Sequence, residues 1–179
     1  MEIKQSPDLA AALSEAFAFA RTHQHEYVGV DHFFWGIINQ AEGKTALKYC
    51  DAELSELKRE VLSFLETSIP RIPEDIYEEF HDSEPEISLG CHELLMIAAQ
   101  HALSSQNVEI TCVNILIAMF RLDDNFSVAL LKGQGVKRFS LIQYHASNHT
   151  RGDYDDDSGY EYSMGVGRDD SDEEDDEES

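Results

Sequence analysis

The sequence has few basic residues. Thirteen Lys and Arg stand against 36 Asp and Glu in 179 residues, which gives a formal net charge of −23. Nucleic-acid binding depends on clustered Lys and Arg side chains that displace counterions from the phosphates. No such cluster occurs here, so the composition argues against a nucleic-acid partner.

Cysteine and long apolar runs are also scarce. Cys50, Cys91 and Cys112 lie far apart without a CxxC pair, a pattern typical of reduced thiols in a cytosolic protein. No apolar run approaches the roughly 20 residues of a membrane-spanning helix. The N-terminus lacks the basic segment and apolar run of a signal peptide. We therefore expect a cytoplasmic protein without a membrane partner.

Catalytic motifs are missing as well. Neither GxSxG nor HExxH occurs, and the tripeptide GKT at 43–45 lacks the first glycine of a phosphate-binding loop because Ile38 occupies that position. Cys91, His92 and Glu93 are sequence neighbours that would point in different directions on a helix. These absences predict that this chain is not an enzyme.

Histidine is more frequent, with eight residues in the chain. His23, His25 and His32, together with Glu26 and Asp31, could supply nitrogen and oxygen ligands to a metal ion if they met in one corner. An exposed histidine-rich turn explains the same pattern. We favour the turn and predict neither a metal nor another cofactor in this chain.

Acidic residues are concentrated at the C-terminal end. Residues 151–179 hold 14 Asp and Glu against two Arg, and little of this stretch is apolar. Such a segment cannot bury enough surface to order itself, and its charges repel one another. We expect a domain over residues 1–148 and a flexible, disordered acidic linker or tail over 149–179.

An internal repeat organises the domain. Residues 25–39 read HEYVGVDHFFWGIIN, and residues 108–120 read VEITCVNILIAMF. In the register that aligns them without a gap, Asp31 falls on Asn114, and we expect Asp31 to cap a helix that begins at His32. Two matched segments of this kind predict two equivalent halves that share one core.

The periodicity of the apolar residues predicts an all-α fold. We expect two pseudo-twofold repeats of four helices, at about residues 8–67 and 88–147, with an exposed connector at 67–88 that includes a possible helical turn, DIYEEF. Ser6 with Pro7 and, later, Ser88 have the positions of helix caps. The other helices are expected at 32–40, 44–50, after Asp51, and at 114–120, 125–132 and 136–144, with Gly43 ending the first of these.

One surface stands out as a candidate docking site. It combines acidic residues with apolar residues that we expect to be exposed: Glu26, Asp31, Glu86, Tyr27, Ile87 and Leu89. An acidic rim around apolar side chains would recognise a basic or mixed partner surface.

These features resemble the double Clp N-terminal domain of the Hsp100 (Clp) unfoldases. The block H-E-x-x-(T/G)-x-(E/D)-H-L-L-x-x-L of that family is matched by HEYVGVDHFFWGII, and AFAFARTHQHEYVGVDH, VNILIAMF and ALLKGQGVKRFSLIQYHAS are most similar to its ClpA branch. The resemblance covers residues 8–148. It also accounts for an acidic linker, which in this family precedes the first ATPase module.

The resemblance implies a non-catalytic domain that receives protein substrates and binds the adaptor ClpS, which delivers substrates with destabilising N-terminal residues to a ClpA-type unfoldase and the ClpP peptidase. The matching positions are His25, Glu26, Asp31, Glu86, Ile87 and Ser88. Relatives of the ClpC branch bind phosphorylated arginine with an acid at the corner of each repeat. Here Asp31 supplies one acid and Asn114 replaces the other, which favours the ClpA-like interpretation.

Two arrangements of the chain agree with this resemblance. It is expected to be a piece of a longer unfoldase in the bacterial cytosol, whose ATPase modules would bind ATP and Mg²⁺ and contact ClpP. The alternative is a free-standing regulator that binds adaptors or substrates without an ATPase. In both cases the isolated domain is expected to be a monomer.

Overall fold

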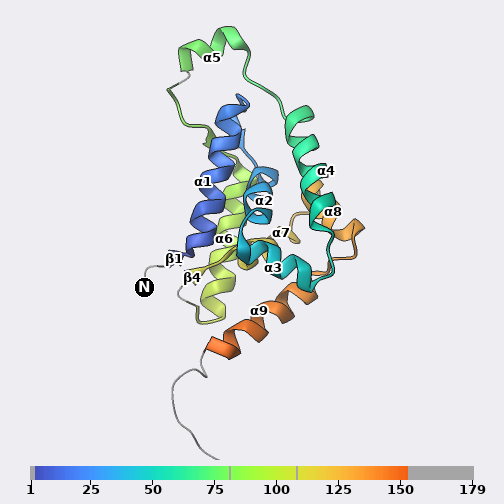
Figure 1. Cartoon of the computed structure of the whole chain (residues 1–179). Coiled ribbons are helices and arrows are strands. Elements are labelled where there is room, and N and C mark those ends of the chain that lie inside the picture. The colour runs from blue at the N-terminus through green and yellow to red at the C-terminus, as the bar shows by residue number, and fades with distance from the viewer. Residues whose placement is uncertain (1–2, 81, 108, 153–179) are drawn as a thin grey trace, which may run out of the picture.

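The structure, a computed structural model, describes residues 3–80, 82–107 and 109–152. Within these ranges the chain is mostly helical, which confirms the predicted all-α class, and four two-residue strands join the helices (Figure 1). The elements are β1 (Lys4–Gln5), α1 (Pro7–Thr22), β2 (Tyr27–Val28), α2 (Val30–Ile38), α3 (Ala41–Tyr49), α4 (Leu54–Thr67), α5 (Glu74–Phe80), β3 (Glu86–Ile87), α6 (Leu89–Ser104), β4 (Glu109–Ile110), α7 (Cys112–Met119), α8 (Phe126–Gly133) and α9 (Arg138–Gly152).

The first helix of each repeat begins as the sequence predicts. Ser6 caps α1 by accepting a hydrogen bond from the Leu9 amide at 3.1 Å, and Pro7 fits the first turn because its missing N–H would have no partner there. Ser88 caps α6 in the same way, from the Cys91 amide at 3.3 Å. Both caps were predicted, and they occupy equivalent positions in the two repeats.

The second helix of each repeat begins differently from the prediction. The cap residue of α2 is Gly29, and its amide donates to Nδ1 of His32 at 2.9 Å. In α7 the cap is Thr111, whose amide donates to Oδ1 of Asn114 at 2.8 Å. Asp31 therefore does not cap α2, because the side chain of the third helical residue satisfies the amide at the cap.

The predicted register of the two repeats is consequently wrong by a single position. His32, not Asp31, corresponds to Asn114, and Asp31 corresponds to Val113. The offset that aligns Ser6 with Ser88 also aligns Gln24, before β2, with Gln106, before β4. Both residues have the left-handed conformation, each with a φ of 58°. A carboxylate at the corner of the second repeat is still missing, but the residue in its place is Val113.

The strands link the repeats reciprocally. β1 of the first repeat pairs in parallel with β4 of the second, and β2 of the first pairs in parallel with β3 of the second. Each repeat thus contributes one strand to each ladder. This exchange is the arrangement that a pseudo-twofold relation between the halves requires.

The core lies around α2 and α7, the most apolar helices. Phe33, Phe34 and Ile37 of α2 are fully buried, as predicted, and every residue of α7 is buried. α2 approaches α1 so closely that a Cβ on Gly36 would lie 2.1 Å from the backbone oxygen of Ala12. The packing of the first two helices therefore depends on a glycine at position 36.

Several predicted boundaries are wrong. Gly43 does not end a helix: it lies inside α3, packed against the Ile37 backbone. α7 begins at Cys112 rather than Asn114, and the connector contains a full helix, α5. α9 runs from Arg138 to Gly152, so it begins and ends later than the helix predicted at 136–144. The boundary between domain and tail at 148–149 stays a prediction, and residues 153–179 of the predicted tail lie outside the described residues.

Candidate functional site

The β2–β3 ladder forms one corner of the molecule. Tyr27 lies opposite Glu86, and the ladder is held by hydrogen bonds from the Glu86 amide to the Glu26 carbonyl (3.3 Å) and from the Ser88 amide to the Val28 carbonyl (3.0 Å). Segments from different repeats, far apart in the sequence, are thereby fixed side by side. The predicted residues 86–88 and 26 do meet in space.

The corner exposes apolar side chains between acids. Tyr27 is 47% exposed and Leu89, the first residue of α6, is 84% exposed, while Glu26 and Glu86 are also exposed. The negative charge of Glu26, with a smaller effect of Glu86, raises the pKa of the Tyr27 hydroxyl. Ile87 and Ser88 are half-buried between these groups. The corner is thus an apolar surface in a negative electrostatic field.

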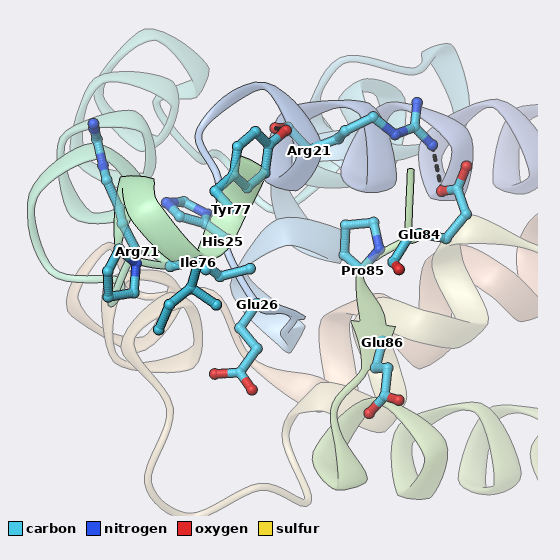
Figure 2. A pocket seen from close by; sticks show the side chains of 12 residues that line it. Arg21, His25, Glu26, Arg71, Ile76, Tyr77, Glu84, Pro85 and Glu86 are labelled. Atoms are coloured by element: carbon cyan, nitrogen blue, oxygen red, sulfur yellow. Dashed lines mark hydrogen bonds and ion pairs between the residues drawn. The ribbon is translucent and has the colours of Figure 1, made fainter. Parts of the chain in front are cut away.

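A pocket of about 460 Å³ opens beside this corner, between α5 and the chain that returns from it to β3. Figure 2 shows Ile76 and Tyr77 of α5 on one side and Glu84, Pro85 and Glu86 on the other. The other residues that line it are Arg21, His25, Glu26, Arg71, Ile72, Pro73 and Ser83. The pocket therefore contains three predicted site residues, His25, Glu26 and Glu86.

His25 is not a surface residue. It is 1% exposed, and its Nδ1 lies 2.8 Å from Nε2 of His32, which is also 1% exposed. Because Nδ1 of His32 accepts from the Gly29 amide, the neutral His32 ring carries its proton on Nε2 and donates it to His25. The two rings form a chain of hydrogen bonds that starts at the backbone of the helix cap.

Both rings are held in the neutral form. Burial, with the neighbouring histidines as a further cause, lowers the pKa of His32 from 6.5 to about 4. Burial also lowers the pKa of His25 to about 4, with His23 and Arg71 as further causes. At neutral pH the chain therefore ends in an N–H at Nε2 of His25. This atom is buried and has no hydrogen-bond partner in the part of the chain that the structure describes.

Comparison with known proteins assigns the family. The model of the Clp repeat (R) N-terminal domain matches residues 4–134, most of the chain. The chain belongs to the Clp N-terminal domain family. The predicted resemblance is thereby confirmed, and the double repeat described above is the Clp N-domain fold.

Solved Clp N-domains share this fold. The Hsp104 N-terminal domain from Candida albicans superposes with a TM-score of 0.66 at 17% identity, over 82% of this chain and 91% of that one. The N-terminal domain of the ClpV1 ATPase from E. coli EAEC gives 0.64 at 18% identity, over 80% and 85% of the two chains. A ClpV N-domain solved in complex with a VipB peptide gives 0.60 at 19% identity, over 82% and 91%.

A full-length relative is a ClpA homolog protein from Fuscovulum blasticum, 23% identical over 141 residues. The match takes in 79% of this chain and 17% of that protein, so the chain spans about a sixth of the relative's length. Among the described residues of this Clp N-domain, no helix is long and apolar enough to cross a membrane.

The Asp31 side chain of the Clp N-domain is hydrogen-bonded to the second repeat. Its carboxylate accepts hydrogen bonds from the Ser127 amide (3.0 Å), the Ser127 hydroxyl (2.6 Å) and the Asn125 side chain (3.4 Å). It therefore ties α2 of the first repeat to the start of α8 in the second, where the helix dipole favours a negative charge. These contacts give Asp31 a structural role, and a role in partner binding stays a prediction.

His23, His25 and His32, all within the described residues of the Clp N-domain, do not form a metal-binding cluster. His23 stacks on Phe19 with ring centroids 4.0 Å apart, and the nitrogens of His25 and His32 that face each other are already hydrogen-bonded. No group of three or more His, Cys, Asp or Glu side chains in the described ranges is placed to hold a metal ion.

The enzyme-like sequence features of the Clp N-domain have structural roles. The GKT tripeptide at 43–45 lies inside α3, where the Lys44 amide donates to the Gln40 carbonyl at 3.0 Å, so the tripeptide is part of a helix and does not form a phosphate-binding loop. The Cys91 thiol is buried and donates to the Val28 carbonyl, and burial raises its pKa to about 12, which keeps it un-ionised. His92 and Glu93 are exposed.

Sequence reasoning missed most of the pocket, since three of its twelve lining residues were predicted. Arg21, Arg71, Ile76 and Tyr77 line it but were not predicted as site residues. The only available signal was the apolar spacing of Ile76, Tyr77 and Phe80 in an otherwise acidic connector, which marks a helix with one apolar side.

Proposed function

We propose that this Clp N-domain is a non-catalytic docking module of a ClpA-type, ATP-dependent unfoldase in the cytoplasm. It would receive protein substrates and bind the adaptor ClpS, and the ATPase part of the same machine would pass substrates to ClpP. The family membership and the similarity to a ClpA homolog support this role. A ClpV N-domain, which shares the fold, has been solved with a peptide of a protein partner.

The observation that carries the proposal is the corner at β2–β3. An interface needs apolar side chains that are exposed before binding, with polar groups at the rim. Leu89 and Tyr27 are the exposed apolar side chains of this corner, and Glu26 and Glu86 are the polar groups at its rim. Because both strands are fixed in a ladder, these side chains lose little freedom on binding.

The acids at the rim define the partner's chemistry. A partner with Lys or Arg around an apolar patch would be steered to the corner, since the chain has a formal net charge of −23. A partner with acids at the same positions would be repelled. The adaptor contact is therefore expected to weaken as the salt concentration rises.

Calorimetric titration of the full chain with ClpS tests the proposal. We expect saturable binding that Leu89→Ser weakens at least tenfold, because Leu89 is the most exposed apolar side chain of the corner. Met96→Ser is the matched control, since Met96 is an apolar residue of the same helix that is 64% exposed. The control should bind ClpS as the wild type does. Absence of binding at high micromolar ClpS, or equal loss in both variants, would contradict the adaptor role.

A further inference from the structure

The pocket under α5 contains an unused hydrogen-bond donor. Nε2 of His25 carries a proton because Nδ1 accepts from His32, and this N–H is buried without an acceptor among the described residues. The great majority of buried polar groups in proteins are hydrogen-bonded. A buried donor next to an open pocket therefore indicates that a ligand supplies the acceptor.

The cations near this donor are not equivalent. Arg21 is paired with Glu84 across the pocket (Figure 2), so its charge is already neutralised. Arg71 lies beside the His25 ring, lowers its pKa, and has no carboxylate partner among the described ion pairs. The Arg71 guanidinium donates to the Glu66 carbonyl at 3.3 Å, and Glu66 does not line the pocket, so the donor end of the pocket consists of the His25 N–H.

The opposite side of the pocket is acidic. Glu26 and Glu86 line it and are exposed, and neither forms an ion pair among the described residues. Together with Glu84 they outnumber the two arginines. A free carboxylate would therefore be repelled overall, whereas a neutral carbonyl could reach the donor and a cation could reach the acids.

The walls between the two ends are apolar. Ile76 of α5, the Tyr77 ring and Pro85 face the space, and the volume of about 460 Å³ lies in the range of roughly 300–1,000 Å³ that is usual for ligand pockets. A basic amino acid within a peptide fits this pocket. Its backbone carbonyl is a hydrogen-bond acceptor, the methylene groups of its side chain are apolar, and the end of its side chain is a cation.

We propose that the pocket beneath α5 binds an extended peptide segment, with a backbone carbonyl on the His25 N–H and a Lys or Arg side chain between Glu26 and Glu86. The segment would belong to a protein that the domain receives. That the ligand is part of a protein rests on the proposed function. The inference does not need ClpS to be that ligand.

Amide NMR spectra of the full chain, titrated with two capped tripeptides, test the proposal. The probes are acetyl-Ala-Lys-Leu-amide and acetyl-Ala-Glu-Leu-amide, which differ only in the central side chain and its charge. We expect saturable shifts at Ile72 and Tyr77 with the lysine peptide, at least tenfold weaker binding of the glutamate peptide, and a shift of the His25 ring N–H signal.

Variants separate the pocket from the surface. Ile76→Arg places a cation in the pocket wall, at a position that is 45% exposed, and is expected to abolish binding of the lysine peptide while the protein stays folded. Met96→Arg, on the outer face of α6, should leave it unchanged. No saturable shift in the wild type, equal binding of both peptides, or equal binding to Ile76→Arg would overturn the proposal. If the lysine peptide binds and ClpS does not, the adaptor role fails and the pocket stands; the reverse pattern rejects the pocket alone.

Discussion

Replacing His32 by asparagine tests the hydrogen-bond chain at the helix cap. The second repeat carries Asn114 at the equivalent position, where its side chain accepts from the Thr111 amide and also contacts His101 at 2.9 Å. Asn at position 32 is expected to accept from the Gly29 amide as Asn114 does from Thr111, and to donate to Nδ1 of His25, which takes the place of His101 as the second partner. The variant should therefore fold, with a loss of about 1 kcal/mol for the smaller buried side chain.

The change should appear in the pH dependence of stability. His32 has a pKa of about 4 in the folded protein and about 6.5 when unfolded. Between these pH values His32 is protonated in the unfolded chain but not in the folded protein. The free energy of unfolding therefore falls as the pH drops from 6.5 to 4. One group with this shift accounts for at most about 3.4 kcal/mol, since each unit of pKa is worth about 1.4 kcal/mol. Because His25 shares the shift, we expect about 1–2 kcal/mol from His32 alone.

Urea denaturation followed by circular dichroism at pH 7.5, 6.5, 5.5 and 4.5 measures the free energy of unfolding as a function of pH. The curves of wild type and His32→Asn should be nearly parallel above pH 6.5. Below it the wild type should lose about 1–2 kcal/mol more than the variant, while carboxylates contribute equally to both. Parallel curves down to pH 4.5 would refute the neutral, buried state of His32. A variant that does not fold at pH 7.5 would refute the equivalence of His32 and Asn114.

Two further predictions concern contacts between helices. Gly36→Ala would place a Cβ 2.1 Å from the Ala12 oxygen and should lower the free energy of unfolding, measured with heat or urea, by about 3 kcal/mol or more. Gly133→Ala is the control, because its new Cβ would have no described atom within 4 Å, and it should leave the stability unchanged or raise it by up to about 1 kcal/mol. Equal effects of the two variants on stability would contradict the close packing at Gly36. Asp31→Ala should destabilise the protein by about 1–3 kcal/mol, because the buried hydroxyl of Ser127 loses its acceptor; unchanged stability together with loss of ClpS binding would instead assign Asp31 to the interface.

The sequence was sufficient for the fold class and the first caps. Ser6 and Ser88 are residues with a strong preference for the cap position, so a local rule identifies them. The predicted register of the two repeats was wrong because histidine is not a usual capping residue. Asp31, close to the start of α2 at Val30, is a residue type that commonly caps helices. Only the tertiary structure shows that His32 accepts from the Gly29 amide and that Asp31 turns to the other repeat.

The site was predictable in part. Glu26 and Glu86 were expected at a surface corner and are exposed there, because Glu26 precedes the short strand β2 and Glu86 begins the short strand β3. His25 was expected at the same surface but is buried, since its ring packs near Phe19 and His32. The role of Arg71 depends on an antiparallel bridge between His25 and Arg71, a contact between distant parts of the chain that no local pattern encodes.

The reciprocal ladders have a consequence for biosynthesis. Lys4–Gln5 pairs with Glu109–Ile110, and Tyr27–Val28 pairs with Glu86–Ile87, so both ladders join the two halves of the chain. While the protein emerges from the ribosome, the first half has no strand partner until the second half has left the exit tunnel. Folding is therefore expected to start late in translation. Separately expressed halves, cut in the connector between α4 and α5, should be unfolded alone and should assemble when mixed.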